Sequence, residues 1–249
     1  STPGKEELER QFGLDRWYVA NVAEDADIDV AARTLAESNK VSLVEYDIKM
    51  KLATDGLTFP YEGPVTAPAT RAAMSDLGFN DPLIAEQWNY YNLGDLSIAS
   101  SAYAGADINI KDTWKTLTAG NPSVIVAVVD QGVDYTHPDL VPNMWVNEAE
   151  KNGKPGVDDD GNGYVDDVHG YNFVDGEGDI NYDKSQDFDT GHGTHCAGII
   201  GAVNNNGIGM AGVAGGTGNN DGVRIMSCQI FSKGYGGETR YSSRAIKYA

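Results

Sequence analysis

The sequence predicts an α/β fold in which helices cover a parallel sheet, with a small α+β unit in front of it. An uninterrupted apolar run at 124–129 is typical of a strand buried on both faces of a parallel sheet, and 223–231 is predicted to be a second such strand. Between them, residues 193–203 read as an apolar helix and 168–174 as a short strand. Strands that alternate with helical segments in this way indicate an α/β domain rather than an all-helical or all-β one.

Residues 1–52 form a separate unit in this prediction. Asp27 can cap a helix, because the apolar residues after it recur at helical spacing: Ile28, Ala31, Ala32 and Leu35. Apolar and charged residues alternate over 44–52, which predicts a strand with one buried face, and 16–22 is predicted as another strand. A unit this small is marginally stable alone, so we expect it to dock on another surface.

Residues 53–80 are predicted to be a linker, because Pro60, Pro64 and Pro68 interrupt a stretch without a sustained period. A second unit runs over 81–249. Its last segment reads as a helix that no capping glycine follows, and no later strand completes the sheet. We therefore expect the folding unit to continue in residues that this chain does not contain.

The charge balance limits the partners that the protein can have. Its 18 Lys and Arg residues face 37 Asp and Glu residues, a net charge of −19, which disfavours binding to nucleic acid and to anionic membranes. No apolar run approaches the roughly 18 residues that would span a bilayer. The first residues also lack the basic and apolar pattern of a signal peptide.

Cys196 and Cys228 are the only cysteines of the chain. They form no CxxC or Cys/His array, which disfavours a disulfide framework or a structural zinc site. Each lies in an apolar segment, which favours free buried thiols, and a bridge between the two is the alternative.

The candidate chemistry lies where strands and helices meet. Asp130 ends the first buried strand, and ligands bind at the carboxyl ends of strands in open α/β sheets, although Asp-Gln-Gly alone is more often an ordinary turn. His192 is flanked by Gly191 and Gly193 and stands at the mouth of the next helix, which begins at about Thr194. A histidine that acts as a general base needs an acceptor on its second ring nitrogen, and Asp130 can supply one.

Three segments resemble the subtilase family of serine proteases. Residues 128–140 resemble its aspartate signature, 191–198 its histidine signature, and 204–214 the segment that follows the histidine helix. The resemblance implies a subtilisin-like parallel sheet and peptide-bond hydrolysis by an Asp-His-Ser triad. It gives Asp130 the role of orienting the imidazole, and His192 the roles of general base and then general acid.

The family's third signature, Gly-Thr-Ser-Met-Ala, does not occur in the 249 residues, and its oxyanion-hole asparagine is expected downstream of Ala249. The chain is thus expected to lack the C-terminal half of the catalytic domain. We expect the chain to be inactive alone. Its expected partner is the C-terminal half of the catalytic domain, which truncation or nicking would have separated from it. Gly234, Tyr235, Gly236 and Gly237 correspond to the stretch that pairs with the acyl side of a polypeptide substrate, and a plain glycine turn is the alternative.

An acidic loop between the two signatures predicts a structural Ca²⁺ site. Counted from Asp158, oxygen ligands fall at positions 1, 3, 5 and 7 of an EF-hand-like loop, with Gly163 at its sharp turn. Position 12 is His169 instead of glutamate, so a nearby aspartate must complete the shell. The alternative is an acidic turn without a cation. The predicted ligands are Asp158, Asp160, Asn162, Tyr164 through its carbonyl, and Asp166 or Asp167.

The sequence also suggests two further candidate metal sites. The family's second calcium site would fall on Asp139 and Asn205, where one extra residue near Gly207 departs from the pattern. A zinc site on His192 and His195 is a rival interpretation, but the pair is separated by a glycine and lacks the HExxH glutamate. We expect a structural or hydrogen-bonding role for His195.

Residues 1–52 resemble the subtilase propeptide, a small ferredoxin-like domain that assists folding, docks on the catalytic domain and ends in its cleft. Residues 81–88 resemble the start of a mature enzyme, so processing is expected between 52 and 80. The resemblance implies an extracytoplasmic zymogen (secreted, periplasmic or surface-attached) whose signal peptide is not in this chain. The alternatives are a non-catalytic, calcium-bound pseudoprotease or interaction module and, third, a metallohydrolase.

Overall fold

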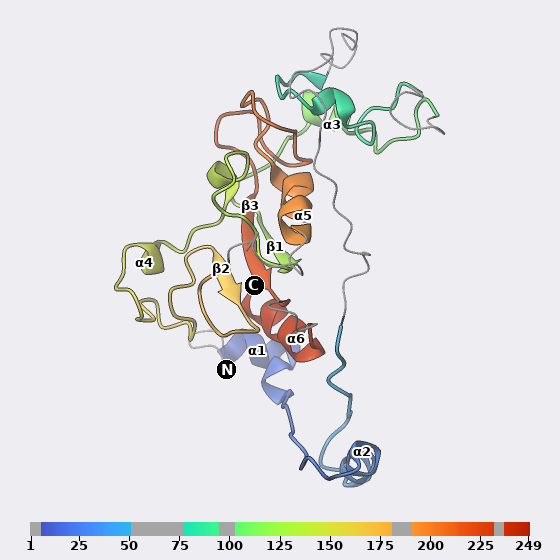
Figure 1. Ribbon diagram of the computed structural model, residues 1–249, viewed down its shortest axis with the longest axis vertical. Coiled ribbons are helices and arrows are strands. Elements are labelled where there is room, and N and C mark those ends of the chain that lie inside the picture. The colour runs from blue at the N-terminus through green and yellow to red at the C-terminus, as the bar shows by residue number, and fades with distance from the viewer. Residues whose placement is uncertain (1–5, 51–76, 95–102, 181–190, 232–236) are drawn as a thin grey trace.

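A three-stranded parallel sheet lies at the centre of the computed structural model (Figure 1). Its strands are, in order across the sheet, β1 (Ile125–Asp130), β3 (Arg224–Gln229) and β2 (Gly170–Asn172), and both pairings are parallel. The α/β class and the parallel sheet are therefore as predicted. The structure describes residues 6–50, 77–94, 103–180, 191–231 and 237–249.

The strands differ in how deeply they are buried. β3 is buried at every position except its first, as predicted for a strand covered on both faces. The same prediction is wrong for β1, in which Ile125 is 49% exposed and Val128 is the one fully buried residue. The difference follows from position, because β1 is an edge strand of the described sheet and β3 lies between two neighbours. Asp130 pairs with Gln229, at the carboxyl end of the sheet.

Helix α5 (His192–Gly201) packs against β1 and β3, and it confirms the predicted helix although it begins two residues before Thr194. It begins early because Gly191 has a φ of 72°, a left-handed conformation that glycine adopts without strain. Gly193 lets the first turn approach the sheet, since a Cβ there would collide with the backbone oxygen of Gln131. The two glycines thus hold His192 against the end of β1.

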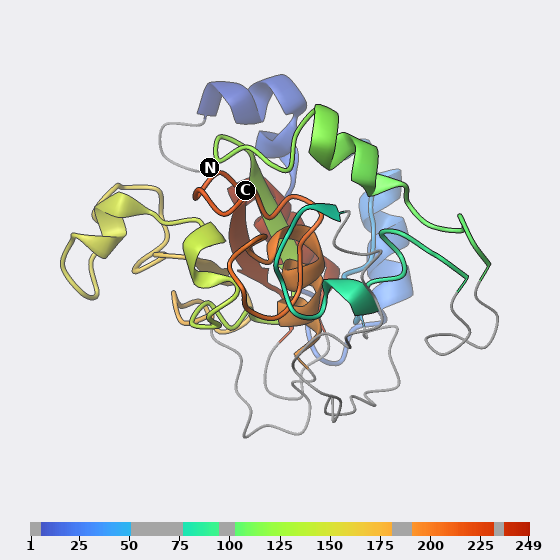
Figure 2. The ribbon, with the colours of Figure 1, turned by 90° about the horizontal axis from the view of Figure 1, so that it is seen from above.

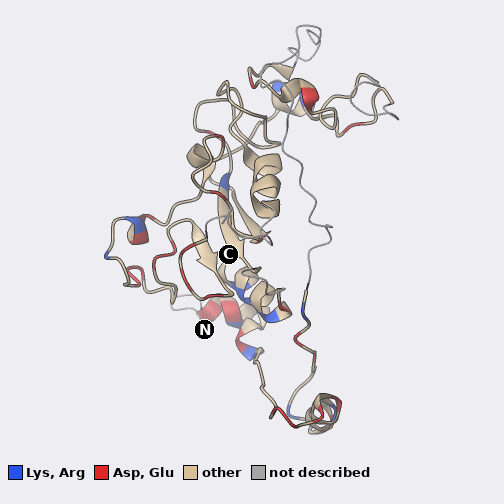
Figure 3. Cartoon of the chain, in the orientation of Figure 1, with Lys and Arg blue, Asp and Glu red and all other residues tan. Residues whose placement is uncertain are grey.

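Helix α6 (Thr239–Tyr248) confirms the helix predicted at the end of the chain. Beside it lies α1 (Glu6–Phe12), an acidic helix that the sequence reading did not predict (Figure 3). Glu9 of α1 forms an ion pair of 2.9 Å with Lys247 of α6, and the Glu9 side chain is 4% exposed. The beginning of the chain therefore contacts the last helix.

Helix α2 (Ile28–Glu37) also confirms its prediction, with Asp27 as the N-cap: Oδ1 accepts hydrogen bonds from the backbone N–H groups of Asp29 and Val30 at 2.9 and 3.1 Å. Its apolar stripe, however, is not buried, and Ile28 is 54% exposed. The helix lies at one end of the molecule, away from the sheet (Figure 1).

The two predicted N-terminal strands are wrong within the described residues. Residues 17–23 are unpaired, and 44–50 contain a single bridge, between Lys49 and Glu238. An alternating pattern buries one face only when a neighbouring strand extends the sheet, and here Tyr18 is 87% exposed. The division of the chain at 52 and 80 stays a prediction, because 51–76 lie outside the described residues.

The remaining elements are short. Figure 2 shows α3 (Ile110–Thr116) as the green helix. Its Trp114 packs with Phe79 and Tyr90 in a core of its own, with ring centroids 5.0 and 5.3 Å apart. Both cysteines are free, as predicted, and the alternative of a bridge is wrong. None of the helices in the described ranges is long and apolar enough to cross a bilayer. Besides α3 (Ile110–Thr116), the short elements are α4 (Glu148–Lys151) and the 3₁₀ turns η1 (Leu14–Arg16), η3 (Ile84–Glu86) and η4 (Val141–Asn143).

Candidate functional site

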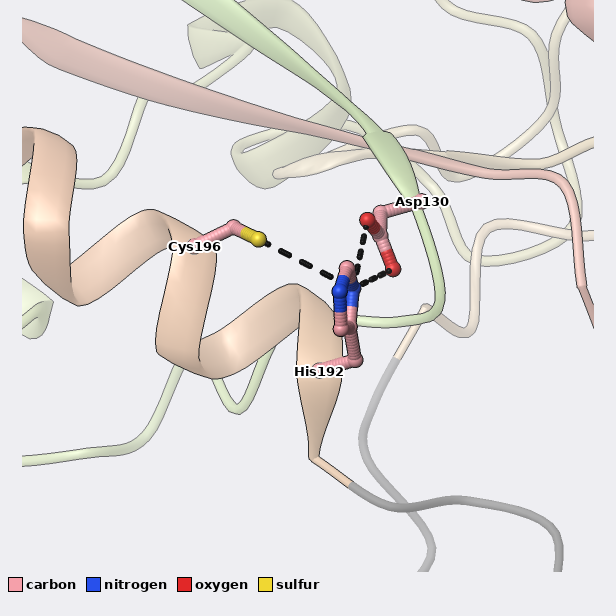
Figure 4. A group of neighbouring side chains, drawn as sticks. All are labelled: Asp130, His192 and Cys196. Atoms are coloured by element: carbon pink, nitrogen blue, oxygen red, sulfur yellow. Dashed lines mark hydrogen bonds and ion pairs between the residues drawn. The ribbon is translucent and has the colours of Figure 1, made fainter. Parts of the chain in front are cut away.

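The carboxylate of Asp130 and the imidazole of His192 are hydrogen-bonded (Figure 4). Nδ1 of His192 lies 2.8 Å from both Oδ1 and Oδ2 of Asp130. An ionised carboxylate only accepts hydrogen bonds, so Nδ1 carries the proton of a neutral imidazole and Nε2 is left as an acceptor. The His192 side chain is 38% exposed, whereas that of Asp130 is 15% exposed. The pair therefore contains a partly exposed base, His192, whose tautomer is fixed by the hydrogen bond between Nδ1 and Asp130.

Gln131 helps to hold this pair, and the sequence reading missed it. Its backbone N–H donates to Oδ1 of Asp130 at 2.7 Å, and its side-chain Oε1 accepts from the backbone N–H of His192 at 3.2 Å. The Gln131 residue is 3% exposed. Its place directly after the strand-ending aspartate was the available signal, but in a single sequence the turn interpretation explains the residue equally well.

Cys196 lies one turn along α5 from His192, with its Sγ 3.7 Å from Nδ1 (Figure 4). The sequence reading predicted a buried free thiol there and did not connect it to the histidine, although the i, i+4 spacing on a helix places the two on one face. Burial, and next the charge of Asp130, raise the pKa of the Cys196 thiol. The thiol is therefore protonated at neutral pH.

His195 does not join this group. It is exposed, and its side chain is not among the metal-binding atoms that converge around His192 in the described residues. The arrangement does not bring His192 and His195 together as the rival zinc interpretation requires.

The acidic loop has the turns expected of an EF-hand-like segment. Asp158 Oδ2 accepts from the backbone N–H of Gly163 at 2.8 Å, and Asp160 Oδ1 accepts from that of Asn162 at 3.0 Å. Asn162 Oδ1 in turn accepts from the N–H of Tyr164 at 2.7 Å. Gly163 has a φ of 91°, a conformation that favours glycine. These hydrogen bonds fold the loop back on itself around the carboxylates of Asp158 and Asp160.

Two residues outside the loop, Asn147 and Glu150, complete its frame, and the sequence reading missed both. Glu150 is 5% exposed, and its two carboxylate oxygens accept from the backbone N–H groups of Asp159 and Asp166 at 2.7 and 2.9 Å. Asn147 Nδ2 donates to Asp160 at 2.9 Å. Carboxylate oxygens of Glu150, Asp158 and Asp160 lie within 4.8 Å of one another.

The other predicted ligands of the loop occupy different places. Asp167 is fully buried, and burial raises the pKa of its carboxyl group. Its Oδ2 accepts from the hydroxyl of Tyr248 at 2.6 Å. Asp166 instead accepts from the backbone N–H of Gly156 at 2.8 Å. The Tyr164 ring packs edge-on against Tyr248, with centroids 4.8 Å apart.

A second acidic pair, Asp81 and Asp139, is buried beside the segment that follows α5. Each is 2% exposed, and burial raises the pKa of both carboxyl groups. Asp81 accepts from the backbone N–H of Asn205 at 2.8 Å, while Asp139 accepts from the side chain of Asn206 at 2.7 Å. The sequence reading singled out Asp139 and Asn205 here but missed Asp81, which is distant in sequence.

Gly237 is the one member of the predicted substrate stretch that the structure describes; Gly234, Tyr235 and Gly236 lie outside the described residues. Its carbonyl oxygen accepts a hydrogen bond from the backbone N–H of Met50. The next contact is the antiparallel bridge of Lys49 with Glu238. The segment 47–50 is thus added, like a short strand, to the chain that leads into α6.

Asp47 sits at the N-terminus of α6. Its Oδ1 accepts from the Thr239 hydroxyl at 2.8 Å and from the Arg240 backbone N–H at 2.9 Å. Its Oδ2 lies 3.3 Å from Nε of Arg240. A carboxylate from another part of the chain therefore supplies the helix cap that Glu238, at the N-cap position, does not.

A cavity of about 530 Å³ lies beside Tyr135 and His169. Its walls include the stacked rings of Tyr135 and His169, whose centroids are 4.8 Å apart, and none of its lining residues belongs to the pair. Nδ1 of His169, at the twelfth position of the loop, donates a hydrogen bond to the carbonyl oxygen of Trp145, 2.8 Å away. The Nδ1 atom of that imidazole therefore binds a backbone carbonyl oxygen and not a carboxylate of the loop.

A family model described as the subtilase family matches residues 121–249. Subtilisin-like protease 1 of Plasmodium vivax is 50% identical over 113 residues, which are 45% of this chain and 17% of that protein. The protein of the same name from Plasmodium berghei is 41% identical over 135 residues, 54% of this chain and 19% of that protein. Halolysin of Haloferax mediterranei is 33% identical over 149 residues, 60% of this chain and 23% of its own length. The chain thus spans about a fifth of the length of these relatives.

Among solved structures, the chain is similar to a serine protease of Aeromonas sobria in complex with a chaperone. The two are 26% identical with a TM-score of 0.49, over 69% of this chain and 23% of that one.

Proposed function

The chain belongs to the subtilase family, and from that premise we propose that it is the N-terminal part of a subtilisin-like serine endopeptidase zymogen. The observation that carries the proposal is the bond of 2.8 Å between Asp130 and Nδ1 of His192, at the end of β1 and the start of α5. A hydrolase of this kind needs a base with a fixed tautomer and an exposed second nitrogen, and the pair has both.

In the proposed reaction, Nε2 of His192 accepts the proton of a serine hydroxyl as that oxygen attacks the scissile carbonyl, and later gives it to the leaving amine. Asp130 keeps Nδ1 protonated and stabilises the imidazolium that forms between the two steps. No Gly-Thr-Ser-Met-Ala sequence occurs in the 249 residues, so the proposal assigns the serine and the oxyanion-hole asparagine to a further part of the protein.

We assign residues 47–50 to the end of an inhibitory propeptide. Support comes from the backbone bond of Met50 to Gly237 and from the cap that Asp47 gives to α6. An extended segment that pairs with a chain edge occupies it as a peptide substrate would. In this proposal the N-terminal part docks on the catalytic domain, and its residues 47–50 occupy the place of the substrate segment on the acyl side.

We also assign Ca²⁺ to the acidic loop. The donor set fits the ion, because Glu150, Asp158 and Asp160 bring oxygen atoms together and Ca²⁺ takes oxygen ligands almost without exception. Glu150 would do what a glutamate at the twelfth position does in an EF-hand, and Asn162 and the Tyr164 carbonyl would fill positions 5 and 7. When bound, the ion would offset the mutual repulsion of these carboxylates. Asp81, Asp139 and Asn205 are the residues that we assign to a second calcium site.

The proposal places the mature protein outside the cytoplasm. EF-hand-like loops also occur in extracellular modules, whose weaker affinity suits the calcium concentrations found outside cells. Detection of the native protein in the culture supernatant or on the cell surface, against a cytoplasmic marker, tests this assignment.

The catalytic proposal is tested on the protein translated from the whole reading frame. We expect a serine-reactive fluorophosphonate to label it after removal of the N-terminal part, and the His192→Ala variant to label at least 10³-fold more slowly. Equal labelling of both proteins would contradict the role of His192. No labelling, with no Gly-Thr-Ser signature after residue 249, would instead favour a calcium-bound interaction module.

A further inference from the structure

A stripe of positive charge runs along α6. Arg240, Arg244 and Lys247 fall at i, i+4 and i+7, which places them on one face of the helix. The helix contains these three basic residues and no acidic one, whereas the whole chain has 18 basic and 37 acidic residues. We call Arg240, Arg244 and Lys247 the basic stripe. Its composition suits an acidic partner.

We propose that the C-terminal half of the basic stripe, Arg244 and Lys247, forms with Tyr164 of the acidic loop a docking site for the acidic helix α1. The N-terminal part of the chain is then held at both ends of α6, by Asp47 at one end and by Glu9 at the other. The docking does not depend on the proposed peptidase function. Its meaning as a second anchor of a propeptide rests on that function.

The two contacts lie two turns apart on α6, about 10 Å along its axis. At the N-terminal end, Oδ2 of Asp47 is 3.3 Å from Nε of Arg240, and the Asp47 side chain is 30% exposed. At the C-terminal end, Oε1 of Glu9 is 2.9 Å from Nζ of Lys247, and the Glu9 side chain is 4% exposed. The second contact is therefore the more deeply buried of the two, and the shorter.

Helix α1 buries its charge and exposes its apolar residues. Glu9 is 3% exposed, whereas Leu8 and Phe12 are 53% and 67% exposed. Burial of apolar surface therefore does not explain the position of α1. A buried carboxylate costs free energy unless a cation or hydrogen bonds compensate it, and here Lys247 supplies the cation. The ion pair is thus the contact that explains why this face of α1 is turned inward (Figure 3).

The docking site contains more than Lys247. The hydroxyl of Tyr164 is hydrogen-bonded to Arg244 and lies within electrostatic reach of Glu9 and Lys247. The guanidinium of Arg244 is also 5.9 Å from the ring centroid of Phe173, a distance at which a cation and an aromatic face attract each other. Glu9 therefore meets a surface that α6 and the acidic loop form together.

Two anchors on one chain hold more tightly than either does alone. When one contact opens, the other keeps the opened group at a high effective concentration, so that it closes again before the segment leaves. A cut in the predicted linker, 53–80, would make residues 1–52 a separate polypeptide that non-covalent contacts alone retain. Loss of the Glu9 anchor should then speed the release of that polypeptide.

Hydrogen exchange of the 249-residue chain tests the Glu9 anchor. A seven-residue helix is too short to be stable alone in water, so the amides of α1 are protected only while it is docked. We expect Glu9→Gln to speed exchange over 6–12 at least 10-fold, while the N–H of Met50 keeps its protection. Glu7→Gln is the matched control, because the Glu7 side chain is 90% exposed. Equal exchange over 6–12 in the two variants would overturn the anchor.

A double-mutant cycle tests whether Glu9 and Lys247 act as a pair. Lys247→Met keeps most of the aliphatic stem but leaves Glu9 buried without its cation, so it should speed exchange of α1 more than Glu9→Gln does. The double variant should exchange no faster than Lys247→Met alone. Additive effects would show that the two side chains do not act together, and would overturn the proposal. The amides of β3 report in each variant whether the core stays folded.

Release after cutting tests the consequence. A specific protease site is inserted within 53–80 of the full chain, the chain is cut, and loss of the N-terminal piece after dilution is followed by size-exclusion chromatography. We expect Glu9→Gln to speed the loss about 10–100-fold, and Glu7→Gln to leave it unchanged. Loss at the wild-type rate in Glu9→Gln would contradict the second anchor.

These readouts do not use peptide hydrolysis. A whole protein that fluorophosphonate never labels, but in which Glu9 and Lys247 are coupled, would contradict the peptidase proposal and support the docking site. A labelled protein in which α1 exchanges as fast in the wild type as in Glu9→Gln would overturn the docking site and leave the peptidase proposal standing.

Discussion

At the scale of single residues, the site depends on which nitrogen of His192 holds the proton. In the structure, Nδ1 is hydrogen-bonded to the carboxylate of Asp130. Gln131 holds both ends of this pair, because its backbone N–H donates to Asp130 and its side chain accepts from the backbone N–H of His192. A carboxamide at position 130 would present a donor as well as an acceptor to the ring, and could stabilise the wrong tautomer. The charge matters as well, because the imidazolium formed during the reaction needs a counter-charge.

We therefore expect Asp130→Asn to lower the rate of peptide hydrolysis by the whole protein about 10⁴-fold, with little change in fold. The measurement is kcat/KM with a fluorogenic peptide, beside a circular dichroism spectrum. Asp112→Asn, on the exposed first turn of α3, is the matched control and should keep the wild-type rate. A loss smaller than 10-fold in Asp130→Asn would count against the triad.

At the scale of elements, α6 joins parts of the chain that are far apart in sequence. Its N-terminus is capped by Asp47, its last turn pairs with Glu9, and Tyr248 reaches the acidic loop through Asp167. Figure 3 shows the acidic α1 beside the basic residues of α6. The helix is thus where the N-terminal part and the acidic loop meet.

Asp47→Asn should weaken this docking by about 1 kcal/mol, the usual value of a helix cap, or about 5-fold in an equilibrium. The backbone N–H of Arg240, which donates to Asp47, should exchange with deuterium correspondingly faster. Hydrogen exchange read by mass spectrometry is the measurement. Asp25→Asn, in the exposed turn before α2, should leave the exchange of α6 unchanged. Unchanged exchange in Asp47→Asn would mean that this cap does not hold the segment.

Tyr248→Phe should destabilise the chain by about 1–3 kcal/mol, because it removes a donor from the buried carboxylate of Asp167. The expected readout is a lower urea midpoint with an unchanged m-value. Tyr103, which is 79% exposed, provides the control substitution, and Tyr103→Phe should leave the midpoint where it is. If the two variants unfold alike, the bond between the loop and α6 contributes little.

At the scale of the whole molecule, the protein has an excess of negative charge, and some of its carboxyl groups are buried. The chain carries a net charge of −19, and Asp81, Asp139 and Asp167 are buried carboxyl groups whose pKa is raised by burial. Buried ionised carboxylates cost free energy unless a cation or hydrogen bonds compensate them. The folded state should therefore gain more from Ca²⁺ than the unfolded chain does.

We expect removal of Ca²⁺ with a chelator to lower Tm by roughly 5–10 °C, which corresponds to a few kcal/mol of lost binding free energy. Differential scanning calorimetry with and without added Ca²⁺ measures the shift. Glu150→Gln should reduce the shift, whereas Glu37→Gln, at the end of α2, should preserve it. A Tm that is the same with and without Ca²⁺ would contradict both calcium assignments.

Local sequence determined much of this protein. The strands β1 and β3, the helices α2, α5 and α6, and the turns of the acidic loop all follow from periodicity, caps and glycines within a few residues of each position. These features are short-range, so a single sequence contains their causes. The proximity of Asp130 to His192 was also predictable, because strand ends and helix starts meet at one edge of an α/β sheet.

Only the tertiary structure decided which side chains from distant segments meet. Glu150 lies beside the acidic loop, Asp81 near Asp139, and Cys196 near Asp130. No local pattern specifies these neighbours, because they depend on how turns of the chain are packed in space. The same reason explains the failed strands of the N-terminal part. An alternating pattern indicates that one face of a strand can be buried. Whether another element covers that face depends on the tertiary packing.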